Sequence, residues 1–225
     1  MTQSTLEVPV PYSRNAINWT LQSSARDGRR REPLDPAARS APSADGRDVT
    51  MRDPFGRVKL EALSVPDVWH APTALALYAV GPRSTVTVAL NVAGLRAGDI
   101  AGLALFTRPY AWIGAECGSA GLTLSRFEER GGTACRVRID DPRVWLQAEC
   151  DFVSNQVRFR YSTDGRTYVE IGRPRPAGRT PSAAHGIECA LFSCSTKPEA
   201  EGGHAEFDSF LMVTEFSRPT PGLRP

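Results

Sequence analysis

The 225-residue sequence lacks long apolar runs, paired cysteine motifs and a strong net charge. No apolar stretch approaches the ~20 residues of a membrane-spanning helix. Residues 1–15 lack the basic start and apolar centre of a secretory signal. The cysteines are odd in number and include no C-x-x-C pair. This pattern favours reduced thiols in a cytoplasmic protein and disfavours zinc. The cysteines are Cys117, Cys135, Cys150, Cys189 and Cys194.

Signals of several other functions are also missing. The net charge is +2, so we expect no nucleic acid partner and no other strong electrostatic partner. No run of a dozen residues keeps a helical period, and no four-stranded unit repeats as in a propeller. The histidines His70, His185 and His204 do not lie in a nucleophile motif such as G-x-S-x-G. We expect no membrane partner and no cofactor, apart from the structural calcium ion considered below.

Short alternating segments dominate the sequence from residue 57 onward. Val86, Val88 and Leu90 share one side of such a segment, as the side chains of a strand with one buried face do. Turn signals such as Asp140-Asp141-Pro142 separate the segments, and the chain has 19 glycines and 18 prolines. The sequence therefore predicts an all-β fold, a two-sheet antiparallel β-sandwich.

Composition divides the chain into three parts. Residues 1–50 form an N-terminal segment, in which 22–50 are rich in Arg, Ser, Pro and Asp and predict a long exposed or disordered loop. Residues 51–216 are predicted to form the sandwich. Residues 217–225 are predicted to be a flexible tail.

The stretch VRFRYSTDGRTYVEIG at 157–172 predicts a β-hairpin. Two alternating runs flank Asp164-Gly165, and an Asp-Gly pair tolerates the positive φ of a tight turn. Asp164 is therefore interpreted as a turn residue with no part in chemistry.

One predicted strand carries aromatic and acidic side chains on a single face. Tyr110, Trp112 and Glu116 share this face, and Ala111 and Ile113 share the opposite one. Rings stack on the apolar face of a pyranose and polar groups bond its hydroxyls, so such a face suits saccharide binding. The alternative is that the rings lie under a loop or a partner domain. The predicted carbohydrate-binding residues are Tyr110, Trp112, Glu116, Arg158 and Arg160.

Several stretches, in order along the chain, resemble one protein family. They are GPRSTVTVALNVAGLRAGDIAGLALFTRPYAWIG at 81–114, ECDF at 149–152, YSTDGRTYVEIG at 161–172 and ALFSCSTKPEAEGGHAEFDSF at 190–210. They are similar to the C-terminal concanavalin A-like sandwich of glycoside hydrolase family 43 β-xylosidases and arabinofuranosidases. The resemblance covers about residues 57–214, and ordered blocks are more specific than one short motif.

The resemblance implies a concanavalin A-like jelly roll. In family 43 enzymes this module packs on a five-bladed propeller, which carries the catalytic carboxylates. Nothing before residue 57 resembles such blades, so the module is expected to stand alone and to hold no catalytic residue. The loop that approaches the sugar pocket in the family reads TPSAAHGIEC here, with His185 displaced and the Phe missing. Trp69-His70 matches a point near the domain interface and is a candidate for ligand or partner contact.

Two functions are carried forward from the sequence. The preferred one is a non-catalytic, carbohydrate-associated module that binds a saccharide weakly or docks on a partner glycosidase. The alternative is a β-xylosidase-like hydrolase, which needs two carboxylates about 5–9.5 Å apart. The candidate carboxylates are Glu116, Glu149, Asp151, Glu206 and Asp208. A structural calcium ion would use Asp151, Glu206 or Asp208 as oxygen ligands. The sequence predicts no oligomeric state.

Overall fold

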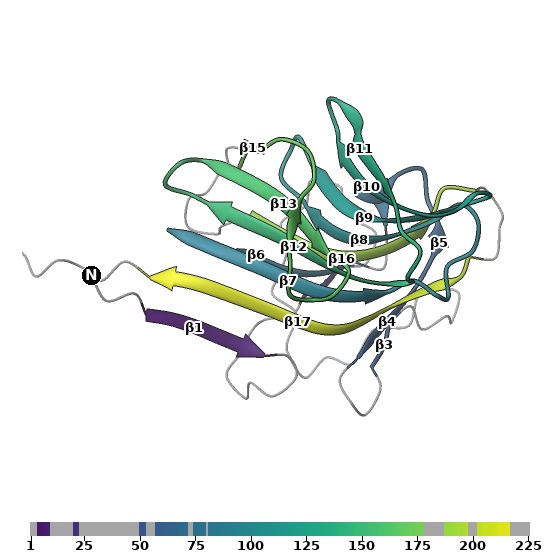
Figure 1. Ribbon diagram of the computed structural model, residues 1–225, viewed down its shortest axis with the longest axis horizontal. Coiled ribbons are helices and arrows are strands. Elements are labelled where there is room, and N and C mark those ends of the chain that lie inside the picture. The colour runs from purple at the N-terminus through teal and green to yellow at the C-terminus, as the bar shows by residue number, and fades with distance from the viewer. Residues whose placement is uncertain are drawn as a thin grey trace, which may run out of the picture.

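Two stacked β-sheets make up the protein (Figure 1). The computed structural model describes residues 4–9, 20–22, 50–52, 57–71, 74–79, 81–177, 187–197 and 202–216. All strand pairings in these ranges are antiparallel except that of β5 with β16. The predicted all-β, two-sheet antiparallel sandwich is thus confirmed. Within the described ranges, no helix has the length and apolar character needed to span a membrane.

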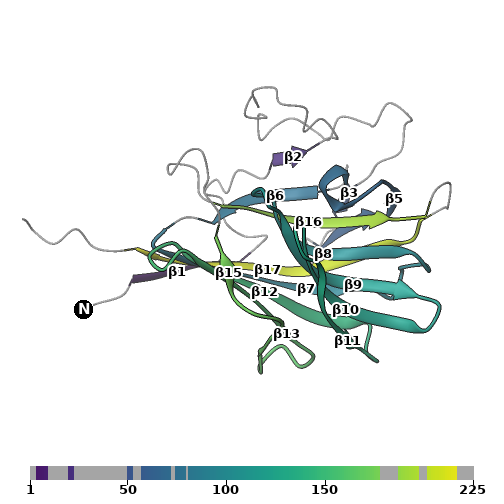
Figure 2. The same cartoon turned by 90° about the horizontal axis from the view of Figure 1, so that it is seen from above.

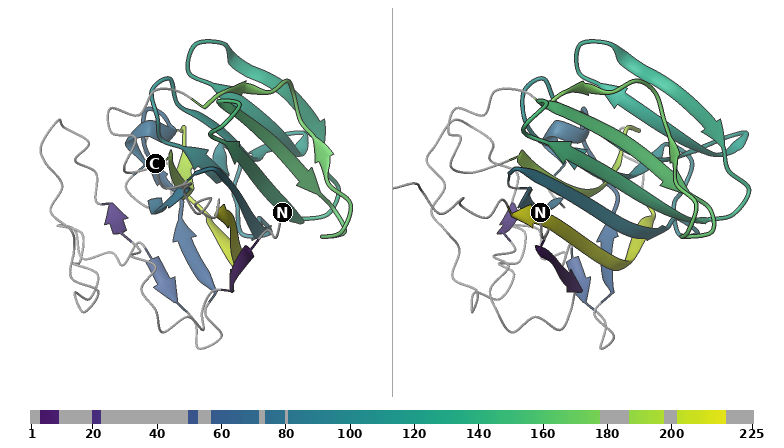
Figure 3. Two further views of the ribbon diagram at one scale, coloured as in Figure 1. Left: turned by 90° about the vertical axis from the view of Figure 1, so that its left-hand side faces the viewer. Right: turned by 60° about the vertical axis from the view of Figure 1, so that its left-hand side comes forward.

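Sheet A has the strand order β14-β13-β12-β7-β17-β4-β3, with β1 beside β17 and β15 beside β13. The long strand β17 pairs with β7 over most of its length, and β1 lies along the other side of β17 (Figure 3). The strands of sheet A are β1 (Ser4–Pro9), β3 (Thr50–Arg52), β4 (Val58–Glu61), β7 (Arg83–Asn91), β12 (Arg143–Asp151), β13 (Gln156–Ser162), β14 (Val169–Glu170), β15 (Arg175–Pro176) and β17 (His204–Phe216).

Sheet B has the order β11-β10-β9-β8-β16-β6-β2, with β5 beside β16. Figure 2 separates the layers, with β16 and β6 above β17 and β12. The elements of sheet B are β2 (Thr20–Gln22), β5 (Leu63–Ser64), β6 (Ala74–Ala79), β8 (Asp99–Leu105), β9 (Ala111–Gly118), β10 (Gly121–Glu128), β11 (Gly132–Arg138) and β16 (Ile187–Ser195). A short 3-10 turn, η1 (Val68–His70), follows β5.

The main core lies between the two sheets. Alternate residues of β7 and β12 point into it, as the period-2 pattern predicts. Leu103 of β8, Ile113 of β9 and Leu191 of β16 face them from sheet B, and all three are fully buried. Burial of this apolar surface between the layers is the main term that holds the sheets together.

A second apolar cluster covers the outer face of sheet B. It contains Ala104, Trp112 and Phe192 from the sheet and Val68 from η1. One face of β16 packs in the main core and the other face packs in this second cluster, so all nine of its residues are buried. Around β8, β9 and β16 the outer face of sheet B is therefore covered, whereas the outer face of sheet A is polar.

The hairpin predicted at 157–172 forms, but its second arm is short. β14 pairs with β13 at Tyr161 and Val169, and the connection between the strands is a polar turn. Asp164 Oδ1 accepts hydrogen bonds from the backbone N–H groups of Arg166 and Thr167, both at 2.8 Å. These hydrogen bonds lower the pKa of Asp164. Its interpretation as a turn residue is confirmed.

Two strands from the predicted N-terminal segment join the sandwich. β1 pairs with β17, and β2 pairs with β6. The predicted loop 22–50 lies outside the described residues except at its two ends. The tail 217–225 and the loop with His185 also lie outside them.

Candidate functional site

The predicted sugar-stacking rings are buried. Tyr110 is 5% exposed and Trp112 is 4% exposed, beneath the segment that contains η1. The Trp112 ring stacks on Phe127 at a centroid distance of 5.5 Å and meets the edge of Phe192 at 5.7 Å. The predicted strand parity is confirmed, since Trp112 and Ile113 lie in different clusters, but the expected exposure of Tyr110 and Trp112 is wrong. The alternative placement, under another segment of the chain, is the one in the structure.

The partly exposed side chain of Trp69 covers this aromatic layer. Its ring lies 5.5 Å from Tyr110 and 5.7 Å from Phe106, and the Arg108 guanidinium lies 4.3 Å above it. The cation–π contact attracts the guanidinium to the face of the ring. Arg108 also pairs with Glu129 at 2.6 Å, and its side chain is largely exposed.

The neighbours of Trp69 complete a polar rim around it. Asp67 caps η1 by accepting the backbone N–H of His70, and its Oδ1 lies 2.6 Å from His70 Nδ1. Burial is the main cause that raises the pKa of Tyr110 to about 12, and the carboxylates of Asp67 and Glu129 add to it. Below, "the Trp69 surface" means Asp67, Trp69, His70, Arg108 and Glu129.

Glu116 lies apart from the two predicted rings. It is at the far end of β9, where its Oε2 lies 3.7 Å from Nη2 of Arg136. Glu116 is four positions after Trp112, which is about 13 Å along the strand. Glu116 lines a small hollow of about 230 Å³ together with Cys117 and Thr123.

Arg158 and Arg160 belong to the opposite face of the molecule. They lie on β13 and alternate with Val157 and Phe159, which point into the core. Their side chains therefore lie on the outer face of sheet A, whereas Trp112 lies on the outer face of sheet B. The structure does not bring the five predicted residues into one site, and their part in binding stays a prediction.

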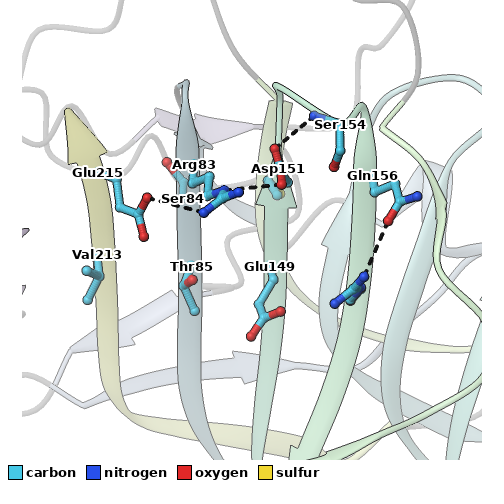
Figure 4. A pocket seen from close by; sticks show the side chains of 11 residues that line it. Arg83, Ser84, Thr85, Glu149, Asp151, Ser154, Gln156, Val213 and Glu215 are labelled. Atoms are coloured by element: carbon cyan, nitrogen blue, oxygen red, sulfur yellow. Dashed lines mark hydrogen bonds and ion pairs between the residues drawn. The ribbon is translucent and has the colours of Figure 1, made fainter. Parts of the chain in front are cut away.

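A polar groove of about 430 Å³ crosses β17, β7, β12 and β13 on the outer face of sheet A (Figure 4). Arg83 lies at its centre, between Asp151 and Glu215. Arg83 Nε donates to Asp151 Oδ2 at 3.1 Å, and Nη1 lies 3.8 Å from Glu215. Thr85 and Glu149 lie further along the same strands. Below, this feature is called the Arg83 groove.

The position of Asp151 in the groove is fixed by the turn that follows β12. Its Oδ1 accepts the backbone N–H groups of Val153 and Ser154, at 2.9 and 3.0 Å. These hydrogen bonds, that of Ser154 above all, lower the pKa of Asp151, and the charge of Arg83 adds to the effect. Asp151 is therefore an ionised anchor and is unsuited to act as a general acid.

Sequence reasoning identified Arg158 at the rim of the groove but missed Arg83 at its centre. A signal was present, because Arg83 begins an alternating segment in which Val86 and Val88 point inward. That parity places Arg83 and Thr85 on the outer face. The carboxylates that orient Arg83 come from other strands, and no local pattern reveals them.

Four of the five carboxylates considered for hydrolysis or calcium pair with arginines, and the fifth, Glu206, accepts from the Asn91 amide at 3.5 Å. Glu149 lies 2.7 Å from Arg160, and Asp208 lies 2.7 Å from Arg143. Within the described residues, no group of three or more His, Cys, Asp or Glu could hold a metal ion. The calcium hypothesis therefore gains no support from this part of the chain.

Glu149 and Asp208 are also too far apart to act on one glycosidic bond. Glu149 lies opposite Thr85 of β7. Asp208 follows Phe207, which lies opposite Leu90 of the same strand. Five residues of strand separate these positions by about 16 Å. A glycosidase needs its two carboxylates within about 9.5 Å of each other.

The residues of the recognised stretches build the frame of the sandwich. Asp99 accepts the backbone N–H groups of Arg96 and Gly203, both at 2.7 Å. A Cβ at Gly203 would lie only 2.0 Å from the carbonyl oxygen of Gly94. The Gly-Gly pair thus lets the start of β17 pack directly against the turn before β8. On the other side of this turn, the Thr196 hydroxyl donates to the carbonyl of Gly98 at 3.1 Å.

Comparison with known families agrees with this frame. The family described as the beta xylosidase C-terminal concanavalin A-like domain matches residues 43–212. The chain belongs to this family. Among curated proteins, none matches the chain at a significant level.

Several solved structures similar to this concanavalin A-like domain are glycoside hydrolase family 43 proteins. A bifunctional GH43-CE protein of Bacteroides eggerthii is 26% identical with a TM-score of 0.67, over 74% of this chain and 22% of its own. An engineered GH43 glycoside hydrolase with endo-xylanase and exo-arabinofuranosidase activity is 24% identical, with a TM-score of 0.62, over 71% of this chain and 34% of its own. The GH43 protein BlXynB of Bacillus licheniformis is 19% identical, with a TM-score of 0.59, over 70% and 33%. The domain thus spans about a fifth to a third of these proteins.

Proposed function

We propose that this concanavalin A-like domain is a non-catalytic, carbohydrate-associated module that docks on a glycosidase catalytic domain of the family 43 type. The observation that carries the proposal is the family match over residues 43–212. The similar solved proteins are three to five times longer than the region they share with this chain, so they contain further parts beside the matching one. The strand positions of Glu149 and Asp208, about 16 Å apart along β7, argue against these two residues as a catalytic pair.

The Trp69 surface is the part of the domain that best suits docking. It joins a partly exposed aromatic ring to an exposed arginine, and Trp and Arg are the residues most enriched at interface hot spots. The aromatic layer beneath, with Tyr110 and Phe106, gives Trp69 a rigid base. The acidic groups of Asp67 and Glu129 supply the polar rim that interfaces have around their anchors.

Docking can be measured with a family 43 catalytic domain freed of its own concanavalin A-like domain. We expect the full chain to bind it, and Arg108→Glu to weaken the complex by about tenfold or more, because the change reverses an exposed charge beside the anchor. Arg138→Glu is the matched control, since Arg138 is an exposed arginine at the edge of β11. Failure of the wild type to bind at about 100 μM would remove the docking proposal.

The hydrolase alternative has its own test. The purified chain alone is assayed with nitrophenyl xyloside. We expect no turnover above that of the Glu149→Gln and Asp208→Asn variants. Turnover by the wild type that either variant abolishes would replace the proposed function with the alternative.

We also propose a reducing, cytoplasmic location. All five cysteines are free, which supports the proposal. The Cys189 thiol donates to the carbonyl of Ile187 at 3.8 Å. The neighbouring Cys150 thiol, together with burial, raises the pKa of Cys189. Cell fractionation followed by alkylation of free thiols would test it, and recovery in an extracellular fraction would contradict it.

A further inference from the structure

We propose that the Arg83 groove binds a neutral saccharide chain. The carbohydrate class of the ligand rests on the proposed function, whereas the site itself follows from the geometry of sheet A. The groove lies on the opposite side of the sandwich from the aromatic layer under Trp69, so a partner docked at the Trp69 surface would leave it open. Its volume of about 430 Å³ is within the range of small-molecule sites.

Arg83 is held in position before any ligand arrives. Asp151 accepts a hydrogen bond from Arg83, and Glu215 forms an ion pair with it from the other side. Two backbone N–H groups hold the Asp151 carboxylate in turn. The Arg83 side chain is nevertheless 55% exposed, so part of its guanidinium faces the groove. A planar guanidinium with parallel N–H groups can donate to two adjacent hydroxyls of one sugar ring. Because the neighbours already order Arg83, binding costs little of its conformational entropy.

The groove alternates hydrogen-bond donors and acceptors with no excess of positive charge. Two arginines, Arg83 and Arg158, and three carboxylates, Glu149, Asp151 and Glu215, line it, and Glu149 is also paired with Arg160 beside the groove. The lining has no excess of positive charge, so a polyanion such as nucleic acid or an acidic polysaccharide gains no net attraction. The polar lining equally disfavours an apolar ligand. A sugar hydroxyl both donates and accepts, so a neutral polyhydroxylated chain matches this surface.

The outer face of β12 extends the groove into a path for several sugar units. Gln147 lies between Glu149 and Trp145 on this face and donates to Thr87 at 3.1 Å. The Trp145 ring is covered by Arg143 at 5.4 Å and is approached by the turn at Gly165. Trp145 is therefore not a free stacking platform, and we expect binding in the millimolar range, without the gain that an open ring would add.

The proposal is tested by recording amide NMR spectra of the full chain with xylohexaose, with an arabino-oligosaccharide and with oligogalacturonate as an acidic probe. We expect a neutral saccharide to shift amide signals at residues 83–85 and 149–158. Arg83→Gln should weaken this binding by about tenfold, because it removes the charged double donor. Thr85→Val removes one groove hydroxyl and touches no ion pair, so it serves as a second variant if the first unfolds. Arg138→Gln, on the other sheet, is the control that should bind as the wild type does.

Three outcomes would overturn the proposal. The first is that neither neutral saccharide shifts these amides at millimolar concentration. The second is that both groove variants bind as tightly as the wild type, and the third is that oligogalacturonate binds in preference to the neutral chains. No partner protein is present in this experiment, so its failure leaves the docking proposal standing. Failure of the docking experiment would likewise leave the saccharide-binding proposal standing.

Discussion

Two arginine side chains enter the space between the sheets at one end of the sandwich. Arg126 is 3% exposed and Arg175 is 7% exposed. Arg126 pairs with Glu128, and Arg175 donates to the carbonyl of Pro109 at 2.6 Å. Desolvation lowers the pKa of Arg175, and the charge of Glu128 opposes that change. Among the described residues, Nε of Arg126 and Nη1 of Arg175 find no hydrogen-bond partner. We therefore infer that the negative charge of Glu128 offsets the cost of burying the two arginine charges.

Glu128→Gln tests this role at the scale of one residue. The amide keeps the size of the side chain but removes the negative charge, so we expect a loss of about 2 kcal/mol in the free energy of unfolding. Denaturant unfolding followed by fluorescence measures it. Asp140→Asn is the control, because Asp140 pairs with Arg138 in full exposure and should change stability by less than about 0.5 kcal/mol. Equal effects of the two changes would contradict the argument.

Strand parity puts Arg126 on the side of Leu124, which is fully buried. The same rule predicts Trp112 on the face opposite Ile113, and the structure confirms this. What the rule could not give is the segment that lies on the second face. η1 reaches Trp112 and Tyr110 from about 40 residues earlier in the chain, and strand parity carries no information on such distant contacts. Local side-chain direction was thus predictable, and exposure was not.

At the scale of strands, β8 and β9 approach each other through a pair of glycines. Gly102 and Gly114 are directly opposite in the register. A Cβ at Gly102 would lie 2.2 Å from the carbonyl oxygen of Ile113, and one at Gly114 would lie 2.5 Å from that of Ala101. Both glycines are in the stretch that resembles the family. Their place in that stretch is explained by strand contact, without a role in ligand binding.

We expect Gly102→Ala to destabilise the domain by about 2 kcal/mol, since a methyl group must push two backbones apart in a packed region. Gly131→Ala is the matched control, because a Cβ there meets no atom within 4 Å. Thermal unfolding of the two variants beside the wild type measures the difference. If Gly102→Ala melts with the control, the close approach of the strands is not what requires glycine.

The hairpin and the long strands were predictable from the sequence because their signals are local. Val86 and Leu146 have period-2 neighbours, and Asp164-Gly165 marks a turn. The Arg83 groove was not predictable, because it needs the register of four strands. Glu149 faces Thr85, and Glu215 faces Arg83 across β7 and β17, only after those pairings are known. Sites assembled from neighbouring strands therefore depend on topology that residue patterns do not contain.

At the scale of the whole molecule, the two outer faces of the sandwich have different chemistry. The outer face of sheet B carries an aromatic layer, and the segment that contains Trp69 covers this layer. Sheet A turns ion pairs outward, such as those of Arg83 and Arg160, and leaves them in contact with solvent. A module with one apolar, covered face and one polar, open face can dock with the first and bind a soluble ligand with the second. The two proposals therefore do not compete for the same surface.

Because the aromatic layer buries Tyr110, we expect the free energy of unfolding to change with pH in the alkaline range. Burial raises the pKa of Tyr110 from 10 to about 12 in the folded protein. Between these values the unfolded chain has lost the phenol proton and the folded chain has kept it. The free energy of unfolding must then fall as pH rises. The contribution is fully present below pH 10 and is lost as pH approaches 12, and it amounts to about 3 kcal/mol for a shift of this size. Tyr110→Phe has no phenol and should lack this component. Denaturant unfolding of both proteins from pH 8 to 11.5 measures the difference, and parallel curves would show that the layer under Trp69 is open to water.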